Sequence, residues 1–482
     1  MSNDIAILSF EAGYWVLIQA LLYFSAIFIF FSSIDDLFID IYYWCRKLFL
    51  KFDDDQIPPL EYREKILAAD EKPIAIMIPA WSEWDVIGRM LEACIQRFTY
   101  DNYKIFVGTY PNDKKTQEIV DQIAKKHHHH VIKVVTKNPG PSTKADCLNN
   151  IIAKIFDYEK NQGIDFSVIM YHDAEDVVHP LELKLFNYQI PTYDMVQIPV
   201  FPLPKKWYNF TTSTYMDEFA EYHSKDVIVR ESITGNVCSA GVGTAFSRKA
   251  ILTLHDMNHG KIFDETSLTE DYEMSYRLHE KGLKEHFELL PTPEDDVPYM
   301  AVRAYFPTKI GKAIRQKSRW MIGIVFQGWK HIGWPWKKLG MMYFLLRDRK
   351  AILSNLVNMF AYFIVINVII DIFDQDLFPD HWHFPSIIPH GTWIWYLVLA
   401  NGLLFLNRIV QRLYFITTTY GIKHGLLSIP RLFLANIINF CAYARAVGQI
   451  KSSKKSKHVK WDKTDHEFPD LNSTTRLINV VV

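Results

Sequence analysis

Three long stretches without a charged residue divide the chain. They are residues 14–34, 351–370 and 386–406. Each is close to the roughly 20 residues that a helix needs to cross a hydrocarbon core of about 30 Å. For the first stretch the alternative is a cleaved signal peptide, but Asp4 and Glu11 precede it and no Lys or Arg occurs before Arg46. A signal peptide begins with basic residues, so we predict three transmembrane helices.

Lys and Arg lie on one side of these stretches. None occurs in residues 1–45 or 351–407, whereas five flank the stretches, namely Arg347, Arg349, Lys350, Arg408 and Arg412. Cytoplasmic loops of membrane proteins carry an excess of Lys and Arg. We therefore predict that the amino terminus and residues 371–390 face outward and that residues 46–350 lie in the cytoplasm.

A shorter apolar segment follows at residues 432–444, between Arg431 and Arg445. Its 13 residues are too few for a comfortable crossing, so we expect an interfacial or re-entrant helix. The basic tail at residues 451–460, KSSKKSKHVK, would then lie at the anionic inner leaflet. The alternative is a fourth crossing, which would place this tail outside.

Between the first two membrane stretches, short apolar runs alternate with helical patterns. The runs are residues 74–80, 104–110, 131–135, 166–171 and 195–200. This alternation predicts an α/β fold, with a mostly parallel sheet and helices on both faces. Polar residues follow three of the runs, and they are Ser82 and Glu83, Asn112 and Asp113, and Asp173 to Asp176. Each could be a turn with a helix cap, but ligands bind beyond the carboxyl ends of such strands, so we expect a common site.

Asp173, Glu175 and Asp176 form the densest acidic cluster of this set, in YHDAEDV. Ionised carboxylates held close together raise one another's pKa unless a cation or strong hydrogen-bond donors lie among them. The cluster therefore predicts a metal, and Mg²⁺ and Mn²⁺ suit ligands that are all oxygens. Strand alternation favours Asp173 with Glu175 as the ligands, whereas a turn would favour Asp176.

Three further stretches carry candidate site residues. In PGPSTKADCLNN, Lys144 lies in the first turn of a predicted helix, where free amide groups favour a phosphate or uracil contact; the alternative is an exposed lysine. The small residues of SAGVGTAFSR allow a ligand to approach the backbone. In LTEDYE, Glu270 and Asp271 begin a helix, and capping accounts for only one of these acids.

The stretch 311–330, GKAIRQKSRWMIGIVFQGWK, is basic at first and then apolar, as in a helix that lies in a membrane surface. Its basic residues Arg315, Lys317 and Arg319 could contact lipid headgroups. The functional interpretation is that Arg319 binds a diphosphate and Trp320 offers a flat face to a sugar.

Composition narrows the class of protein. The 482 residues carry a net charge of -1, which indicates no nucleic-acid partner, and 49% hydrophobic content exceeds the needs of one soluble core. No GxGxxG or P-loop pattern occurs. Five cysteines without CxxC predict reduced, structural thiols. His127–His130 could bind a metal, but its place between a helix and a strand favours an exposed turn.

Together these residues resemble the family 2 glycosyltransferases of the GT-A fold, and in particular the membrane-embedded polysaccharide synthases. The match covers about residues 73–330. It rests on Asp113, the DxD-like element at Asp173, the TED sequence at 269–271 and the QxxRW sequence at 316–320. Stretches along nearly the whole chain, such as VGTYPND, SAGVGT, RQKSRWMIGIVFQGW and VKWDKTDHEFP, are similar to the phage-adsorption protein B family of glycosyltransferases.

The resemblance implies a membrane-bound, inverting glycosyltransferase that moves a sugar from a nucleotide-sugar donor, UDP-hexose or UDP-N-acetylhexosamine, to a growing surface polysaccharide. Asp271 would be the general base and Glu270 would orient it, while Asp173 with Glu175 or Asp176 would hold Mg²⁺ or Mn²⁺. Asp113, Lys144 and Arg319 would contact the donor, and Gln316 and Trp320 would line the acceptor path. Sugar transfer to a lipid carrier is one alternative, and a non-catalytic scaffold for phage adsorption is another.

The same resemblance implies the bacterial inner membrane as the location, with a cytoplasmic catalytic domain. Partners would be the bilayer, a glycan acceptor, and either an outer-membrane export partner or further copies of the chain. We expect a membrane helix in residues 1–50, the GT-A domain in 58–305, interfacial helices in 306–345, two membrane helices in 346–410 and an interfacial helix with a basic tail in 411–482.

Overall fold

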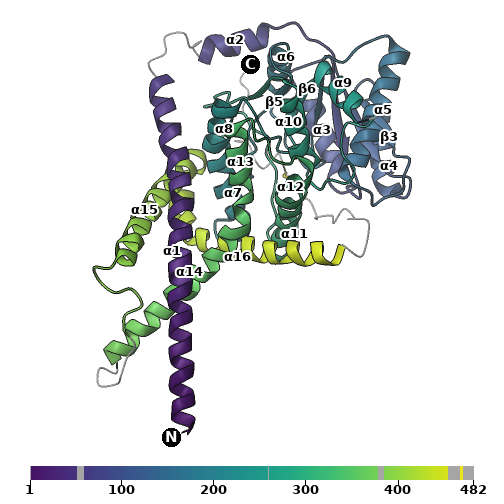
Figure 1. The fold of residues 1–482 in the computed structure, drawn as a ribbon. Helices are drawn as coiled ribbons and strands as arrows, with labels where there is room; N and C mark the ends of the chain where they lie inside the picture. Colours follow the sequence, from purple (N-terminus) through teal and green to yellow (C-terminus); the bar gives the residue numbers. More distant parts are fainter. Residues whose placement is uncertain (1, 51–58, 259, 378–384, 454–466, 471–482) are drawn as a thin grey trace.

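An α/β domain lies at one end of a long helix in this protein (Figure 1). The computed structural model describes residues 2–50, 59–258, 260–377, 385–453 and 467–470. Helix α1, Ser2–Leu50, projects away from the α/β domain, and the amino terminus lies at its far end. The apolar run of α1 is therefore held outside the α/β domain.

A seven-stranded sheet forms the centre of the α/β domain, in the order β3-β2-β1-β4-β6-β5-β7. Its strands are β1 Ile74–Pro79, β2 Tyr103–Thr109, β3 Val131–Val135, β4 Val168–Tyr171, β5 Met195–Gln197, β6 Thr244–Ser247 and β7 Glu285–Phe287. Strand β6 runs antiparallel to β4 and β5, and the other pairs are parallel. The predicted α/β fold and mostly parallel sheet are confirmed. Strands β6 and β7 were not predicted, because their sequences, TAFS and EHF, mix polar with apolar residues and form no apolar run.

Helices cover both faces of the sheet, and each face has its own apolar core. Alternate residues of β1 point to opposite faces, so Ile76 packs with Met90 of one core while Met77 packs with Leu148 of the other. This explains why β1 is apolar throughout. The helices are α2 Pro59–Ala68, α3 Ile87–Arg97, α4 Lys114–Lys126, α5 Lys144–Gln162, α6 Glu182–Gln189, α9 Arg248–Met257 and α10 Glu270–Glu280.

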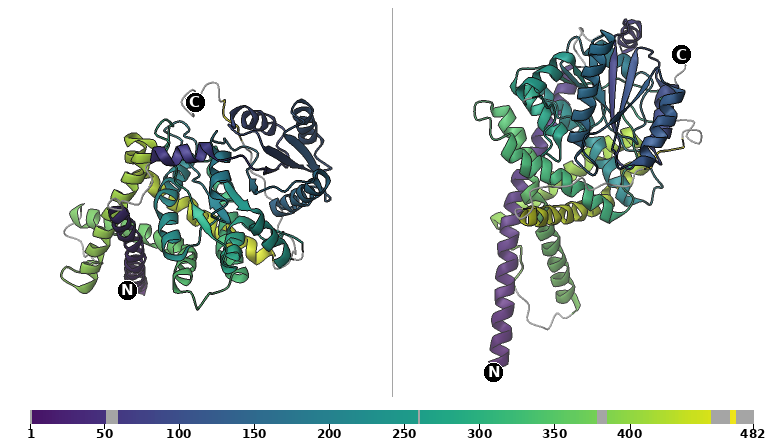
Figure 2. Two further views of the ribbon diagram at one scale, coloured as in Figure 1. Left: turned by 90° about the horizontal axis from the view of Figure 1, so that it is seen from above. Right: turned by 90° about the vertical axis from the view of Figure 1, so that its right-hand side faces the viewer.

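Between the sheet and the long apolar helices lies a second group of helices (Figures 1 and 2). It comprises α7 Phe210–Glu221, the π-helix η1 Tyr222–Asp226, α8 Val227–Thr234, α11 Ile310–Trp320, the π-helix η2 Met321–Gln327, α12 Gly328–His331 and α13 Leu339–Arg349. Helices α7 and α11 pack on the carboxyl-terminal helix α16, Ile422–Ser453. This group therefore joins the α/β domain to the apolar helices.

Four helices in the described part of the chain are long and apolar enough to cross a membrane. They are α1, α14 Ala351–Leu377, α15 Trp393–Tyr420 and α16. Helix α1 packs against both α14 and α15. The predicted stretches 14–34 and 351–370 are helical throughout, whereas the third starts later than predicted, because Pro389 and Gly391 precede the first turn of α15.

Helix α16 differs from its predicted length. The apolar segment was expected to end at Arg431 and Arg445, but the helix spans 32 residues and passes through both. Arg431 is fully buried and forms ion pairs, so its charge does not mark the end of the helix. The helix runs crosswise to α1, beside α11 (Figures 1 and 2). Of the predicted basic tail, residues 454–460 lie outside the described residues, as do residues 378–384 of the predicted outer loop.

Basic residues that flank the apolar helices bind acids of the protein. Arg347 contacts Asp35 at 2.5 Å, and Arg408 contacts Glu221 at 2.5 Å. Asp217 of α7 accepts hydrogen bonds from Arg412 at 3.0 Å and from Arg431 at 2.6 and 2.9 Å. These ion pairs thus hold α1 to α13, and α15 and α16 to α7.

Replacing Asp217 with Asn is expected to destabilise the protein strongly. Asp217 and Arg431 are completely buried, and removing one partner leaves charged guanidinium groups without a counter-ion, at a cost of about 3–5 kcal/mol. Thermal unfolding of the detergent-solubilised protein would measure the loss. Glu92→Gln, which removes one partner of the exposed Lys126–Glu92 pair, is the matched control and should shift the midpoint little. Equal midpoints for the two variants would contradict the role of Asp217.

Candidate active site

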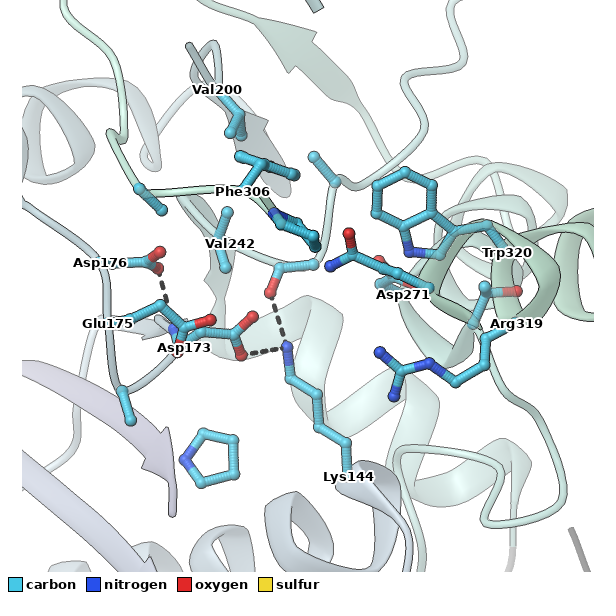
Figure 3. Close-up of a pocket in the computed structure, with 18 of the residues that line it drawn as sticks. Lys144, Asp173, Glu175, Asp176, Val200, Val242, Asp271, Phe306, Arg319 and Trp320 are labelled. Atoms are coloured by element: carbon cyan, nitrogen blue, oxygen red, sulfur yellow. Dashed lines mark hydrogen bonds and ion pairs between the residues drawn. The ribbon is translucent and has the colours of Figure 1, made fainter. Parts of the chain in front are cut away.

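A cavity of about 240 Å³ opens beyond the carboxyl ends of β1 and β4. Every residue predicted to act as a base, a metal ligand or a substrate contact lines it, except Asp113 (Figure 3). These are Lys144, Asp173, Glu175, Asp176, Glu270, Asp271, Gln316, Arg319 and Trp320. Residues from four separate stretches of the sequence therefore converge on one space.

The acidic loop after β4 is braced by its own last residue. Asp176 is buried, and its Oδ2 accepts a hydrogen bond from the Asp173 amide at 2.9 Å and one from His172 Nδ1 at 3.1 Å. His172 Nε2 lies 2.8 Å from Glu182. Burial opposes a charge on His172, but the Glu182 and Asp176 carboxylates outweigh it and raise the His172 pKa to about 10. Asp176 thus closes the turn, and Asp173 and Glu175 line the cavity.

Lys144 extends into the cavity from the start of α5 (Figure 3). Thr143 caps this helix, since its Oγ1 accepts a hydrogen bond from the Asp146 amide at 3.1 Å. The Lys144 ammonium lies 2.5 Å from Asp173 Oδ1 and donates to the Gly241 carbonyl at 3.0 Å. Burial opposes its charge, but Asp173 and Glu270 raise the Lys144 pKa well above its usual value. Lys144 therefore stays positively charged, and it faces the acids.

Glu270 and Asp271 form the first turn of α10, and Thr269 is the residue that precedes it. The helix dipole favours acids at this end. Burial raises the pKa of both carboxyl groups, and the neighbouring Asp271 also raises that of Glu270, to about 7. A carboxylate with a raised pKa in a cavity is a suitable proton acceptor near neutral pH.

The QxxRW sequence forms the end of α11, and its residues divide between two faces. Gln316, Arg319 and Trp320 line the cavity, and the Trp320 ring meets Tyr215 edge-on at 5.9 Å between ring centroids. Lys317 points the other way and binds Glu218 at 2.5 Å and Asn439 of α16 at 2.9 Å. The headgroup interpretation is therefore wrong for Lys317. The contacts of its buried side chain with Glu218 and Asn439 hold α11 against α7 and α16.

The TED and QxxRW sequences are packed together through η2. Gly323 lies so close to Thr269 that an added Cβ would be 2.3 Å from Thr269 Oγ1. Gln327 accepts a hydrogen bond from the Leu268 amide at 2.8 Å and donates one to the Thr266 carbonyl at 2.9 Å. The helix after Trp320 thus sets the position of the acids in α10.

Asp113 has a structural role at the end of β2. Its carboxylate accepts hydrogen bonds from the Ser82 amide at 2.6 Å and from the Thr116 amide at 3.3 Å, so it caps α4 and joins the loops after β1 and β2. It is not among the described residues that line the cavity. The loops meet as predicted, and the nucleotide contact of Asp113 stays a prediction.

Several residues of the cavity wall were not predicted. They are Phe219, Tyr305, Phe306, Lys312 and Glu467. Glu467 comes from a carboxyl-terminal segment whose next residue, Phe468, is buried in the core and accepts a hydrogen bond from Arg89 at 3.3 Å. Its position in VKWDKTDHEFP, a stretch shared with the resembled family, was the only signal. Lys312 lies in the stretch 311–330, four residues before Gln316 of QxxRW, whereas Phe219, Tyr305 and Phe306 lie outside the motifs.

Gly241 is a position where Ala should damage the site itself. Its φ is +78°, and an added Cβ would lie 2.5 Å from Asp271 Oδ2. Gly282 has a φ of +74° and open space around it, so Gly282→Ala carries the same backbone strain without the contact. We expect Gly282→Ala to lose about 1–2 kcal/mol of stability and keep its activity per folded molecule. Gly241→Ala should lose most of its activity as well, in sugar-transfer assays normalised to folded protein. Equal activities would refute the contact with Asp271.

The donor atoms of the cavity fit a hard divalent cation. Asp173, Glu175, Glu270 and Asp271 offer only carboxylate oxygens. Asp264, Glu273 and His331 bring ligand atoms within 4.8 Å of one another elsewhere in the described chain. There Arg277 already pairs with both acids, so no metal is required. His127–His130 forms a turn after α4, as predicted.

Comparisons with known proteins agree with the fold and the motifs. Residues 168–373 match the family model described as glycosyl transferase family group 2. The chain is 45% identical over 466 residues to bacteriophage adsorption protein B of Escherichia coli K12 and to bacteriophage N4 adsorption protein B of Escherichia coli O157:H7. In each case the match covers 94% of this chain and spans 62% of the relative's length.

Among solved structures, a mannosyltransferase from Pyrobaculum calidifontis in complex with GDP-Man and Mn2+ has the same fold, with a TM-score of 0.52 and 13% sequence identity. The match covers 90% of this chain and 99% of that one. The predicted GT-A fold is confirmed. Residues 168–373 therefore match a family 2 glycosyltransferase domain, and most of this chain is similar to bacteriophage adsorption protein B.

Proposed function

We propose that this protein transfers a sugar from a nucleotide-sugar, a UDP-hexose or UDP-N-acetylhexosamine, to the hydroxyl of a glycan acceptor at a membrane surface. The observation that carries this proposal is the convergence of Asp173, Asp271 and Arg319 on one cavity. Such a cavity offers an oxygen-rich metal site, a proton acceptor and a cation for a diphosphate.

Asp271 acts as the general base in this proposal. The acceptor oxygen forms a bond to the anomeric carbon as the bond from that carbon to the diphosphate oxygen breaks. The hydroxyl proton moves to Asp271, and the nucleoside diphosphate leaves with the electron pair. A single displacement of this kind inverts the anomeric configuration. Glu270 orients the base, and Arg319 and Lys144 face the diphosphate.

The acceptor path is formed by Trp320 and Gln316. Gln316 Oε1 is buried without a hydrogen-bond partner in the described part of the chain, so a hydroxyl donor from a sugar would satisfy it. An aromatic ring beside it provides the flat apolar surface that a sugar face covers. Phe306 extends this surface along the cavity wall.

Asp173 and Glu175 would hold Mg²⁺ or Mn²⁺, since Asp176 already accepts two hydrogen bonds within the loop. Two protein carboxylates leave the remaining coordination to substrate phosphates and water, which is common for Mg²⁺. When bound, the cation offsets the negative charge of the diphosphate leaving group.

The proposed arrangement in the membrane is based on which ends of the apolar helices carry Lys and Arg. Helices α1, α14 and α15 would cross the bacterial inner membrane, with the catalytic domain in the cytoplasm and α16 lying along the membrane surface, because α16 runs crosswise to α1 (Figure 1). Exposed apolar side chains of α16, such as Leu426, Phe433 and Ile437, would then enter the lipid. The glycan would need an export partner or further copies of the chain.

Purified protein in detergent, incubated with a panel of UDP- and GDP-sugars and Mn²⁺, should release nucleoside diphosphate from one donor. Isolation of the product and its chain length would separate polymer extension from single transfer to a lipid carrier. Nucleotide-sugars that neither bind nor react would refute the proposed activity and favour a non-catalytic scaffold.

The activity should fall when the pH is lowered from neutral into the mildly acidic range. Burial raises the pKa of Asp271 and of Glu270, to about 7 for Glu270, so protonation of this pair begins at higher pH than for ordinary carboxyl groups at about 4. Because the base works only when ionised, kcat/KM should begin to decrease at a higher pH than an ordinary carboxyl group with a pKa of about 4 would give. A profile that stays flat down to about pH 5 would contradict the raised pKa values.

A further inference from the structure

Lys144 occupies the carboxylate that the proposed metal needs. Its ammonium lies 2.5 Å from Asp173 Oδ1, and the side chains of Lys144 and Asp173 are 17% and 36% exposed. In Figure 3 Lys144 reaches toward Asp173 on one side, with Arg319 and Asp271 on the other. While this oxygen binds the ammonium at this distance, its affinity for a divalent cation is reduced.

The ion pair has a physical reason to persist in the absence of a ligand. A largely buried ammonium is costly unless it is paired and hydrogen-bonded. Asp173 Oδ1 and the Gly241 carbonyl supply these partners, and the Tyr171 ring lies 5.5 Å from the ammonium. A metal that bound alone would have to displace Lys144 from Asp173 without offering it another anion.

A nucleoside diphosphate would change this balance. Its phosphate oxygens are anionic acceptors that suit the ammonium of Lys144, as well as the guanidinium of Arg319. When Lys144 turns to the diphosphate, Asp173 Oδ1 becomes available to the cation. Binding of the diphosphate thus frees Asp173 for the cation, and binding of the cation frees Lys144 for the diphosphate.

We propose that Lys144 is a tethered counter-ion that excludes divalent metal from Asp173 until a nucleoside diphosphate draws it away, so that metal and nucleotide bind with positive coupling. This inference rests on the proposed function, because it assumes the metal site at Asp173. It adds a positioning role for Lys144 before the reaction begins.

The test measures Mn²⁺ affinity of the full-length protein in detergent by electron paramagnetic resonance, without nucleotide and with UDP or GDP. Lys144→Met should bind Mn²⁺ at least about tenfold tighter than wild type in the absence of nucleotide, because the competing ammonium is gone. Lys144→Arg keeps a cation near Asp173 and should bind Mn²⁺ as weakly as wild type. Nucleotide should improve the Mn²⁺ affinity of wild type more than that of Lys144→Met.

The matched control is Lys312→Met, which removes one positive charge from the same cavity wall. If it tightens Mn²⁺ binding as much as Lys144→Met does, the overall electrostatic potential of the cavity explains the effect, and the proposal fails. Unchanged or weaker Mn²⁺ binding by Lys144→Met would also overturn it, while wild type that binds Mn²⁺ with nucleotide would leave the proposed function intact. Wild type that binds neither Mn²⁺ nor any nucleotide would instead refute the proposed function itself.

Discussion

Replacing Asp271 with Asn should lower the rate of sugar transfer by about 10² to 10⁴, the usual contribution of a general base. The amide keeps the shape of the side chain but accepts no proton at neutral pH. Nucleotide-sugar binding should persist, because the base acts on the acceptor hydroxyl. Single-turnover transfer assays and binding titrations with the same donor would measure the two quantities separately.

Glu280→Gln is the control for this variant. Glu280 lies at the exposed other end of the same helix, α10, so this variant also exchanges one carboxylate for an amide on α10 but leaves the cavity unchanged. It should keep wild-type rates. Full activity of Asp271→Asn would remove the base from the mechanism, and loss of donor binding in that variant would show that Asp271 contacts the donor instead.

Replacing Asp173 with Asn, or removing divalent metal with a chelator, should each nearly abolish turnover. Charge stabilisation by a metal at a phosphoryl leaving group is worth several kcal/mol, which corresponds to about 100-fold or more in rate. Asp173→Asn should also lose Mn²⁺ binding in the presence of UDP. Restoring Mn²⁺ after chelation should recover the wild type and leave the variant inactive.

Asp157→Asn serves as the matched control, because Asp157 is exposed on α5, the helix that also carries Lys144. It should match wild type in both assays. Undiminished turnover after exhaustive chelation would exclude a metal requirement. Retained Mn²⁺ affinity in Asp173→Asn would shift the ligand assignment to Glu175 with another acid of the cavity.

Much of the fold follows from local sequence patterns. The strands β1 and β2 are apolar runs whose side chains meet a core on each face, so their composition alone identifies them. The lengths of the apolar stretches in α1 and α14 indicate helices that can cross a membrane. The motifs around Asp173, Asp271 and Arg319 are short and local, and so they could be recognised without coordinates.

Local patterns gave wrong predictions where a charged residue binds a partner that is distant in the sequence. The charge of Arg431 predicts the end of an apolar segment. In the structure Asp217 of α7 pairs with Arg431, and helix α16 continues through it. Lys317 reads as a headgroup contact, but Glu218 and Asn439 bind it inside the protein. In both cases the partner lies on another helix and is separated by many residues.

The sequence by itself therefore determined the parallel sheet, the long apolar helices and the chemical groups of the site. Only the tertiary structure decided that Asp176 braces the loop, that Lys144 pairs with Asp173, and that Glu467 joins the cavity wall. The reason is physical. Periodicity and chain length reflect burial along one segment, whereas the partner of a charge depends on which segments pack together in three dimensions.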